Sequence, residues 1–242
     1  LGCKRSVSGG ITWFFKQEEW GIILEDDCLP HPDFFRFCEE LLEMYADDQR
    51  VSVITGQNLQ YGRERGDGSY YFSKYNHCWG WASWRRSWAH YQGDLRFWPL
   101  WSQSPEWQLV NPDPVERQYW TNIFEKVLAE KLDSWAYPWM ASVWYQQGLT
   151  ITPNVNLVSN IGFGPESTHT AIADSPLANM DTYGIGELIH PTKVNQHTEA
   201  DCYVFNYIFG GRHYRFPLSL LYWPRRAASL AYRHLKHKLS SQ

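Results

Sequence analysis

The chain has 242 residues, a net charge of −4 and 43% hydrophobic residues, which is the balance of a globular protein with a substantial core rather than of a disordered chain. The absence of a strong charge excess argues against nucleic acid as the main partner, and no run of about 18 apolar residues is present that would span a membrane. The 14 Trp, 15 Tyr and 12 Phe residues favour either an aromatic core or a cleft that stacks flat ligands such as sugar rings.

The cysteines and the first residues indicate the cellular context. Five cysteines are scattered without the short spacings of a metal site. An odd number of scattered cysteines is typical of free thiols in a reducing compartment, so we expect a cytoplasmic protein. The chain opens with LGCKRSVSGG, without a signal peptide. This opening reads as the middle of a domain, and we expect an N-terminal truncation.

The first sixty residues predict a strand–helix–strand unit. Residues 3–19 read as a helix, and the apolar run 20–24 reads as a buried parallel strand. Apolar residues then recur at helical spacing from Phe34 to Tyr45, after two prolines that favour a helix start. Residues 50–56 form the next strand. Two strands joined by a helix normally pair in parallel, so we predict an open α/β sheet that is mostly parallel and flanked by helices.

The rest of the chain is less regular. We predict the following elements in chain order: a polar loop at 57–69, a strand at 69–73, an aromatic turn that continues as a helix at 77–91, a loop at 92–114, helices at 115–132 and 133–148, a strand at 149–162 that is broken at Pro153, a loop at 163–171 and an irregular segment at 172–198. Asp133 is expected to cap the helix that it begins, and Gly148 to end it.

Three carboxylates follow the first apolar strand directly. Glu25, Asp26 and Asp27 lie at the carboxyl end of that strand, which is where open α/β sheets bind ligands. Three neighbouring negative charges repel one another unless a cation neutralises them. A divalent ion held by one or two carboxylates and by substrate phosphates would do so. The sequence therefore predicts a metal–phosphate site, and the alternative is a solvated acidic loop that also caps the next helix.

At this point the chain resembles a family. The stretch WGIILEDDCLPHPDFFRFCEELL at 20–42 is similar to the metal-binding stretch of GT-A nucleotide-sugar glycosyltransferases, chiefly bacterial nucleotide-diphospho-sugar transferases and more distantly the GlcNAc-transferase of N-glycans. The likeness is strongest over 1–60 and returns at 77–90 and 133–170. It implies a GT-A catalytic domain over 1–215 without its first nucleotide-binding strands, a UDP- or similarly activated sugar as donor, a glycan or lipid-linked acceptor, and Mn²⁺ or Mg²⁺ as cofactor.

The resemblance also implies roles for single residues around the metal and the donor. Asp27 matches the direct metal ligand, and Asp26 and Glu25 match positions near the ribose and around the metal. His169 would be a further metal ligand or a diphosphate contact. The remaining donor residues would be the basic pair on the first helix and the glycine–aromatic wall, namely Lys4, Arg5, Trp79, Gly80 and Trp81. Core packing of the tryptophans and simple surface exposure of His169, Lys4 and Arg5 are the alternatives.

Two further predictions concern Asp133 and the C-terminal tail. Asp133 resembles the catalytic base of an inverting transferase, which takes the proton of the acceptor hydroxyl. Residues 216–242 read as a basic amphipathic helix that is either an ordinary surface helix or a peripheral contact with an anionic membrane. The expected function is a metal-dependent glycosyltransferase. The alternatives are a non-catalytic sugar- or nucleotide-binding relative and a nucleotide-sugar pyrophosphohydrolase.

Overall fold

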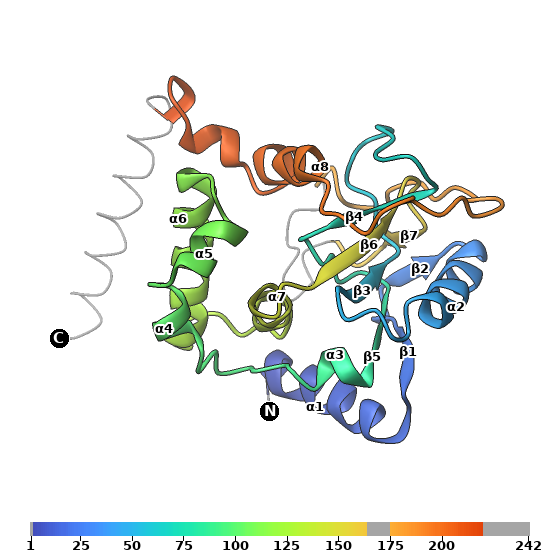
Figure 1. The fold of residues 1–242 in the computed structure, drawn as a ribbon, viewed down its shortest axis with the longest axis horizontal. Coiled ribbons are helices and arrows are strands. Elements are labelled where there is room, and N and C mark those ends of the chain that lie inside the picture. The colour runs from blue at the N-terminus through green and yellow to red at the C-terminus, as the bar shows by residue number, and fades with distance from the viewer. Residues whose placement is uncertain (1, 164–174, 220–242) are drawn as a thin grey trace.

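A computed structural model describes residues 2–163 and 175–219 and shows a mixed α/β fold with an open sheet and surrounding helices (Figure 1). In these residues one sheet has the strand order β1-β5-β3-β6-β4. Its strands are β1 (Trp20–Ile23), β3 (Val51–Thr55), β4 (Tyr70–Ser73), β5 (Trp81–Trp84) and β6 (Leu149–Pro153). A separate ribbon pairs β2 (Cys28–Pro30) with β7 (Val158–Asn160).

The helical elements of the described residues follow in chain order. They are α1 (Gly2–Gln17), α2 (Asp33–Met44), α3 (Arg85–Trp88), α4 (Trp98–Trp101), α5 (Pro105–Val110), α6 (Pro114–Leu128), α7 (Ala136–Tyr145), α8 (Thr198–Tyr203), the π-helical segment η1 (Val204–Ile208) and the 3₁₀ segment η2 (Gly211–Tyr214).

The sheet is mostly antiparallel, so the prediction of a mostly parallel sheet is wrong. Only β3 and β6 pair in parallel, and the other pairings of this sheet are antiparallel. The strands β1 and β3 run in the same direction, but β5 lies between them. The sequence places residues 81–84 in a turn and helix, whereas their four side chains are buried in a strand. Aromatic residues pack well on such a buried pleated surface.

Several predicted elements are confirmed. The helices α1 and α2 and the strands β3 and β4 lie within one or two residues of their expected ranges, and α6 begins as expected but ends four residues early, at Leu128. Two short helices, α4 and α5, lie in a segment that reads as a loop. The break at Pro153 separates β6 from β7, as expected. The helix predicted from Asp133 begins only at Ala136, and Gln147 rather than Gly148 takes the left-handed conformation that ends it, with φ +57°.

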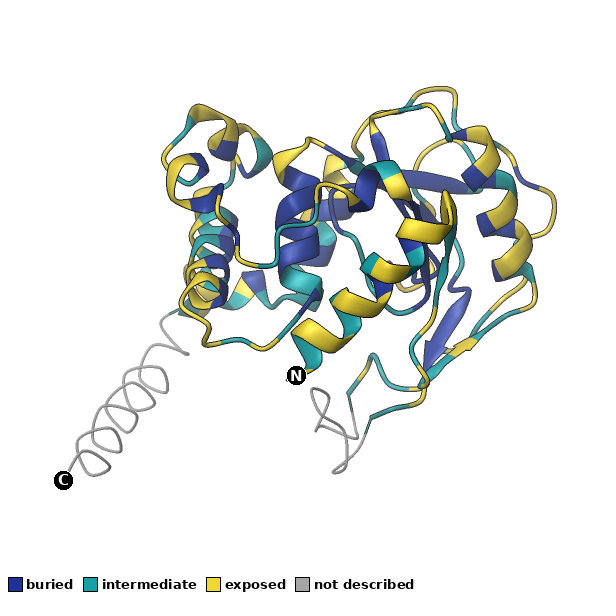
Figure 2. Ribbon diagram, turned by 90° about the horizontal axis from the view of Figure 1, so that it is seen from below, coloured by how far each residue is buried: buried dark blue, intermediate teal, exposed yellow. Residues whose placement is uncertain are grey.

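Two hydrophobic clusters cover the two faces of the sheet. One contains α2 side chains such as Phe34, Phe37 and Leu41, which are fully buried. The other is rich in tryptophan and joins the sheet to α1, α6 and α7. In Figure 1 the helix α7 lies between the sheet and the group formed by α4, α5 and α6, and Figure 2 shows buried residues gathered in that middle region. Much of the aromatic excess is therefore core.

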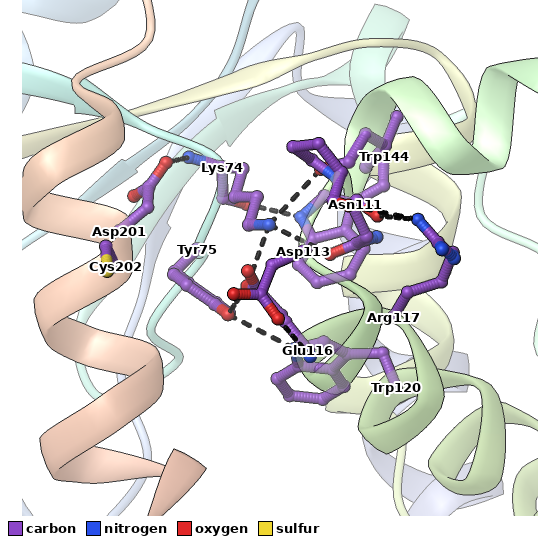
Figure 3. Close-up of polar contacts among 12 residues, drawn as sticks. Lys74, Tyr75, Asn111, Asp113, Glu116, Arg117, Trp120, Trp144, Asp201 and Cys202 are labelled. Carbon is purple, nitrogen blue, oxygen red and sulfur yellow. Dashed lines mark hydrogen bonds and ion pairs between the residues drawn. The ribbon is translucent and has the colours of Figure 1, made fainter. Parts of the chain in front are cut away.

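A buried polar network joins the sheet to the helices (Figure 3). The Lys74 ammonium lies 2.8 Å from Glu116 Oε1 and donates to Asn111 Oδ1 at 2.8 Å. The Tyr75 hydroxyl also donates to Glu116. On the other side, the backbone N–H of Lys74 donates to the Asp201 carboxylate, which belongs to α8. This network fixes the end of β4 against both α6 and α8.

The protonation of Asp201 is expected to make stability depend on pH. Burial raises the pKa of this carboxyl to about 6, against an ordinary value of 3.8, although hydrogen bonds from Ser73 and Gln196 and the Lys74 charge oppose the shift. Because the folded pKa is the higher one, the contribution of Asp201 is fully present below pH 3.8 and is lost as the pH rises through 6. We expect this loss to be about 3 kcal/mol.

Urea unfolding of the Asp201→Asn variant between pH 4 and 7 tests this. As the pH rises over this range, the free energy of unfolding of the unchanged protein should fall relative to that of the variant. The exposed Asp181→Asn is the control, and its difference from the unchanged protein should stay constant. A constant difference for Asp201→Asn as well would contradict the assignment.

No helix among residues 2–163 and 175–219 is long and apolar enough to cross a bilayer. The predicted C-terminal helix lies outside the described residues from position 220 onward.

Candidate functional site

The three carboxylates occupy a tight turn between β1 and β2. The Cys28 N–H donates to the Glu25 carbonyl at 3.0 Å and closes a four-residue turn. Asp26 and Asp27 are its two central residues. Asp26 is exposed, whereas Glu25 and Asp27 are half-buried. The turn therefore places three consecutive acidic residues where β1 ends.

Asp27 lies against the segment that follows β7. Its carbonyl accepts a hydrogen bond from the Ile161 N–H at 2.9 Å. A Cβ atom on Gly162 would overlap the Asp27 carboxylate, so only glycine leaves room for this side chain. The Gly162 N–H is held by Asn160 Oδ1 at 3.0 Å. The pairing of β2 with β7 thus shapes the space around the Asp27 carboxylate.

Asp133 caps α1 and not the helix that follows it. The N–H groups of Cys3 and Lys4 donate to its two carboxylate oxygens, each at 3.0 Å. The helix α7 has Trp135 at its N-cap position, without a side-chain cap. The prediction that Asp133 caps the following helix is therefore wrong. A carboxylate at the positive end of α1 is favourable, and this contact brings the start of the chain beside residue 133.

Trp135 connects Asp133 to the acidic turn. Its indole Nε1 donates to Glu25 Oε1 at 3.2 Å, and its ring stacks on Trp81 with centroids 5.6 Å apart. Trp81 is only 1% exposed. Its ring therefore belongs to the core, as the alternative interpretation has it, and supports Trp135 behind Glu25 instead of facing a ligand.

Two cysteine thiols, those of Cys3 and Cys78, lie close enough to the acidic residues for the negative charges to raise their pKa values. Burial raises the pKa of Cys3, and the charges of Glu25 and Asp133 raise it further. The pKa of Cys78 is raised chiefly by burial and then by Glu25, with a smaller effect of Asp27. These couplings indicate that the acidic turn and Asp133 lie in one negatively charged region. The sequence gives no motif for these cysteines, so pattern reasoning missed them.

The glycine–aromatic segment lies on the Asp27 side of this region. Trp79 is half-buried and meets the ring of Phe163 edge-on at 5.3 Å. Gly80 is buried with φ +68°, and a Cβ on it would lie 2.7 Å from Val158 Cγ2. Gly80 thus permits the close approach of β7. Trp79 is the member of the predicted wall that keeps a partly exposed ring near the Asp27–Gly162 contact.

Lys4 and Arg5 lie in the first turn of α1, next to Asp133. Lys4 is half-buried and Arg5 is exposed. Positive side chains are unfavourable at the positive end of a helix, so the nearby carboxylate offsets them. His169 lies outside the described residues.

The acidic turn has the ligand chemistry of a hard divalent ion. Within the two described ranges, no three His, Cys, Asp or Glu side chains converge to hold a metal on their own. Mg²⁺ is usually held by only one or two carboxylates, with water and phosphate oxygens completing the shell. The half-buried Asp27, which packs against Gly162, and the exposed Asp26 next to it supply two carboxylates of that kind.

Two comparisons with known proteins found no match for the chain. No protein-family model matches the chain, and no similar curated protein is found.

Proposed function

We propose that the protein is a metal-dependent glycosyltransferase that moves a sugar from a nucleotide-diphosphate sugar, with UDP as the first candidate, to a glycan or lipid-linked acceptor. The observation that supports this most is the turn that gathers Glu25, Asp26 and Asp27 at the end of β1. Asp133 lies close to the turn through Trp135, so a metal-binding carboxylate and a candidate base share one region.

Each residue of the site would have a separate role in an inverting transfer. Mn²⁺ or Mg²⁺, when bound, stabilises the charge of the leaving diphosphate. Asp27, with Asp26, would hold the ion, and Trp135 would fix Glu25 near the ribose. Asp133 would accept the proton of the acceptor hydroxyl while the N–H groups of α1 hold its orientation.

Positive and aromatic side chains complete the donor site. Lys4 and Arg5 on α1 would attract the nucleotide phosphates, because both lie in the turn of helix that Asp133 caps. Trp79 would cover one side of the sugar or base with its ring. Gly162 would keep the Asp27 carboxylate in position for an ion that is bound to the diphosphate.

Release of nucleoside diphosphate from UDP-, GDP- and dTDP-sugars, with and without Mn²⁺, tests the proposal on the natural full-length protein. Release that depends on Mn²⁺ supports it. Release of nucleoside monophosphate without an acceptor would instead indicate a pyrophosphohydrolase, and no release from any donor would indicate a binding protein without turnover.

A Gly162→Ala variant is expected to weaken nucleotide binding in the presence of Mn²⁺ about tenfold or more, because the added methyl group displaces the Asp27 carboxylate. Fluorescence titration with UDP and Mn²⁺ measures this. Gly9→Ala on α1 is the control, since its Cβ meets nothing within 4 Å. Unchanged binding by Gly162→Ala would show that nucleotide binding does not depend on the position of the Asp27 carboxylate against Gly162.

A further inference from the structure

Two stacked tyrosine rings are flanked by guanidinium groups on the surface around η1. We name this group the arginine–tyrosine ladder, and its members are Arg63, Arg65, Tyr203, Tyr207 and Arg212. The rings of Tyr203 and Tyr207 stack with centroids 4.6 Å apart. Arg63 and Arg65 lie 4.5 and 5.9 Å from the centre of the Tyr203 ring, and Arg212 lies 5.1 Å from that of Tyr207.

The two rings stack because Tyr203 and Tyr207 are four residues apart in the continuous helical segment of α8 and η1. η1 follows α8 directly and buries Val204 and Phe205 against the core. Tyr207 lies four residues after Tyr203 and remains 53% exposed. Single π-helical turns are rare and occur often at functional sites. The local winding therefore presents one ring of the ladder to solvent.

Two of the three arginines of the ladder have no carboxylate partner among the described residues, whereas Arg65 pairs with Glu199. Arg63 Nη1 donates to Tyr203 Oη at 3.0 Å and to the Gln60 carbonyl at 3.2 Å. Arg65 Nε donates to Gln60 Oε1 at 2.9 Å and lies 3.6 Å from the exposed Glu199. Within residues 2–163 and 175–219, Arg63 and Arg212 have no carboxylate partner. Two ordered cations thus flank the stacked rings.

We propose that the arginine–tyrosine ladder binds an acidic glycan chain, such as one that carries uronate or phosphate groups. The part of the Tyr207 ring that stays exposed can pack against the apolar face of a sugar ring, and guanidinium groups bind carboxylate or phosphate in a paired geometry. Nucleic acid is also a polyanion that binds arginine and aromatic side chains, so it is the competing outcome of the test.

The ladder is connected to the acidic turn through one loop. Tyr61, which precedes Arg63, donates to the Pro176 carbonyl at 3.5 Å. The Asn179 N–H in the same loop donates to the carbonyl of Asn160 at the end of β7. Because β7 pairs with β2, the loop runs from the ladder toward Asp27. Binding at the ladder does not require catalysis, so this inference stands apart from the proposed transfer reaction.

Affinity electrophoresis in gels that contain polygalacturonate or neutral dextran tests the proposal. The protein should be retarded by polygalacturonate, less so as salt rises, and not by dextran. Tyr207→Ala combined with Arg212→Gln should weaken the binding about tenfold or more. The matched control combines Tyr183→Ala with Arg96→Gln, whose side chains are similarly exposed away from the ladder. Asp27→Asn should bind polygalacturonate normally.

Three results would overturn the proposal. The first is the absence of retardation by polygalacturonate. The second is equal retardation of the ladder variant and its control. The third is equal binding to dextran, or tighter binding to single-stranded DNA than to polygalacturonate, because either would assign the ladder to another class of ligand. Loss of transfer with intact glycan binding would refute only the enzymatic proposal.

Discussion

Replacement of Glu116 by alanine is expected to lower the free energy of unfolding by about 3–5 kcal/mol. The Glu116 carboxylate lies 2.8 Å from the Lys74 ammonium, and the two side chains are only 9% and 6% exposed. The variant leaves a buried cation with the neutral oxygens of Asn111 and Val110 as its remaining acceptors. Urea unfolding measures the loss.

Two further variants test whether the loss of stability comes from leaving a buried charge unpaired. One breaks an exposed ion pair, and the other removes both buried charges. Asp94→Ala breaks the exposed ion pair with Arg96, which should cost less than about 1 kcal/mol. The double variant Lys74→Met, Glu116→Leu removes both buried charges and should recover much of the stability. A Glu116→Ala protein within 1 kcal/mol of the unchanged one, by that same order-of-magnitude scale, would contradict the role of the network.

Replacement of Asp27 by asparagine is expected to reduce Mn²⁺-dependent release of nucleoside diphosphate by about a hundredfold or more. The amide keeps the shape of the side chain but removes the charge that attracts the ion, and that stabilisation is worth several kcal/mol in the transition state. The initial rate of release from the best donor measures the effect. Folding should be unaffected, because Asp27 is half-buried in a turn whose closing hydrogen bond is made by the backbone.

The exposed Asp47→Asn is the matched control for Asp27→Asn, because it removes one carboxylate at the far end of α2. It should leave the rate unchanged. An Asp27→Asn protein that keeps the full rate would remove Asp27 from the mechanism.

Local patterns in the sequence predicted α2 from its periodicity and the fully buried strands β3 and β4 from their short apolar runs. The helix α2 shows its periodicity because Phe34, Phe37 and Leu41 meet the sheet while Glu39 faces solvent. The strand β5 was not predictable in this way. Its residues are buried on both sides, so the run Trp81–Trp84 carries no alternation, and its position between β1 and β3 depends on pairing across the whole sheet.

The site was predictable where the chemistry is local and not where it depends on tertiary contacts. The acidic turn is visible in three consecutive letters, and the structure places it at the end of β1 as expected. The partners of Asp133 were not visible, because the N–H groups of Cys3 and Lys4 lie about 130 residues away along the chain. The same holds for Trp81, whose burial depends on its stacking with Trp135.

Calorimetric titration of Mn²⁺ into the natural full-length protein in the presence of UDP tests whether Asp27 holds a metal ion together with a nucleotide. We expect Mn²⁺ to bind only when the nucleotide supplies its phosphate oxygens, and we expect Asp27→Asn to abolish the heat of binding while Asp47→Asn preserves it. Absence of Mn²⁺ and Mg²⁺ uptake with UDP, GDP or dTDP, or equal uptake by the Asp27→Asn protein, would contradict this prediction.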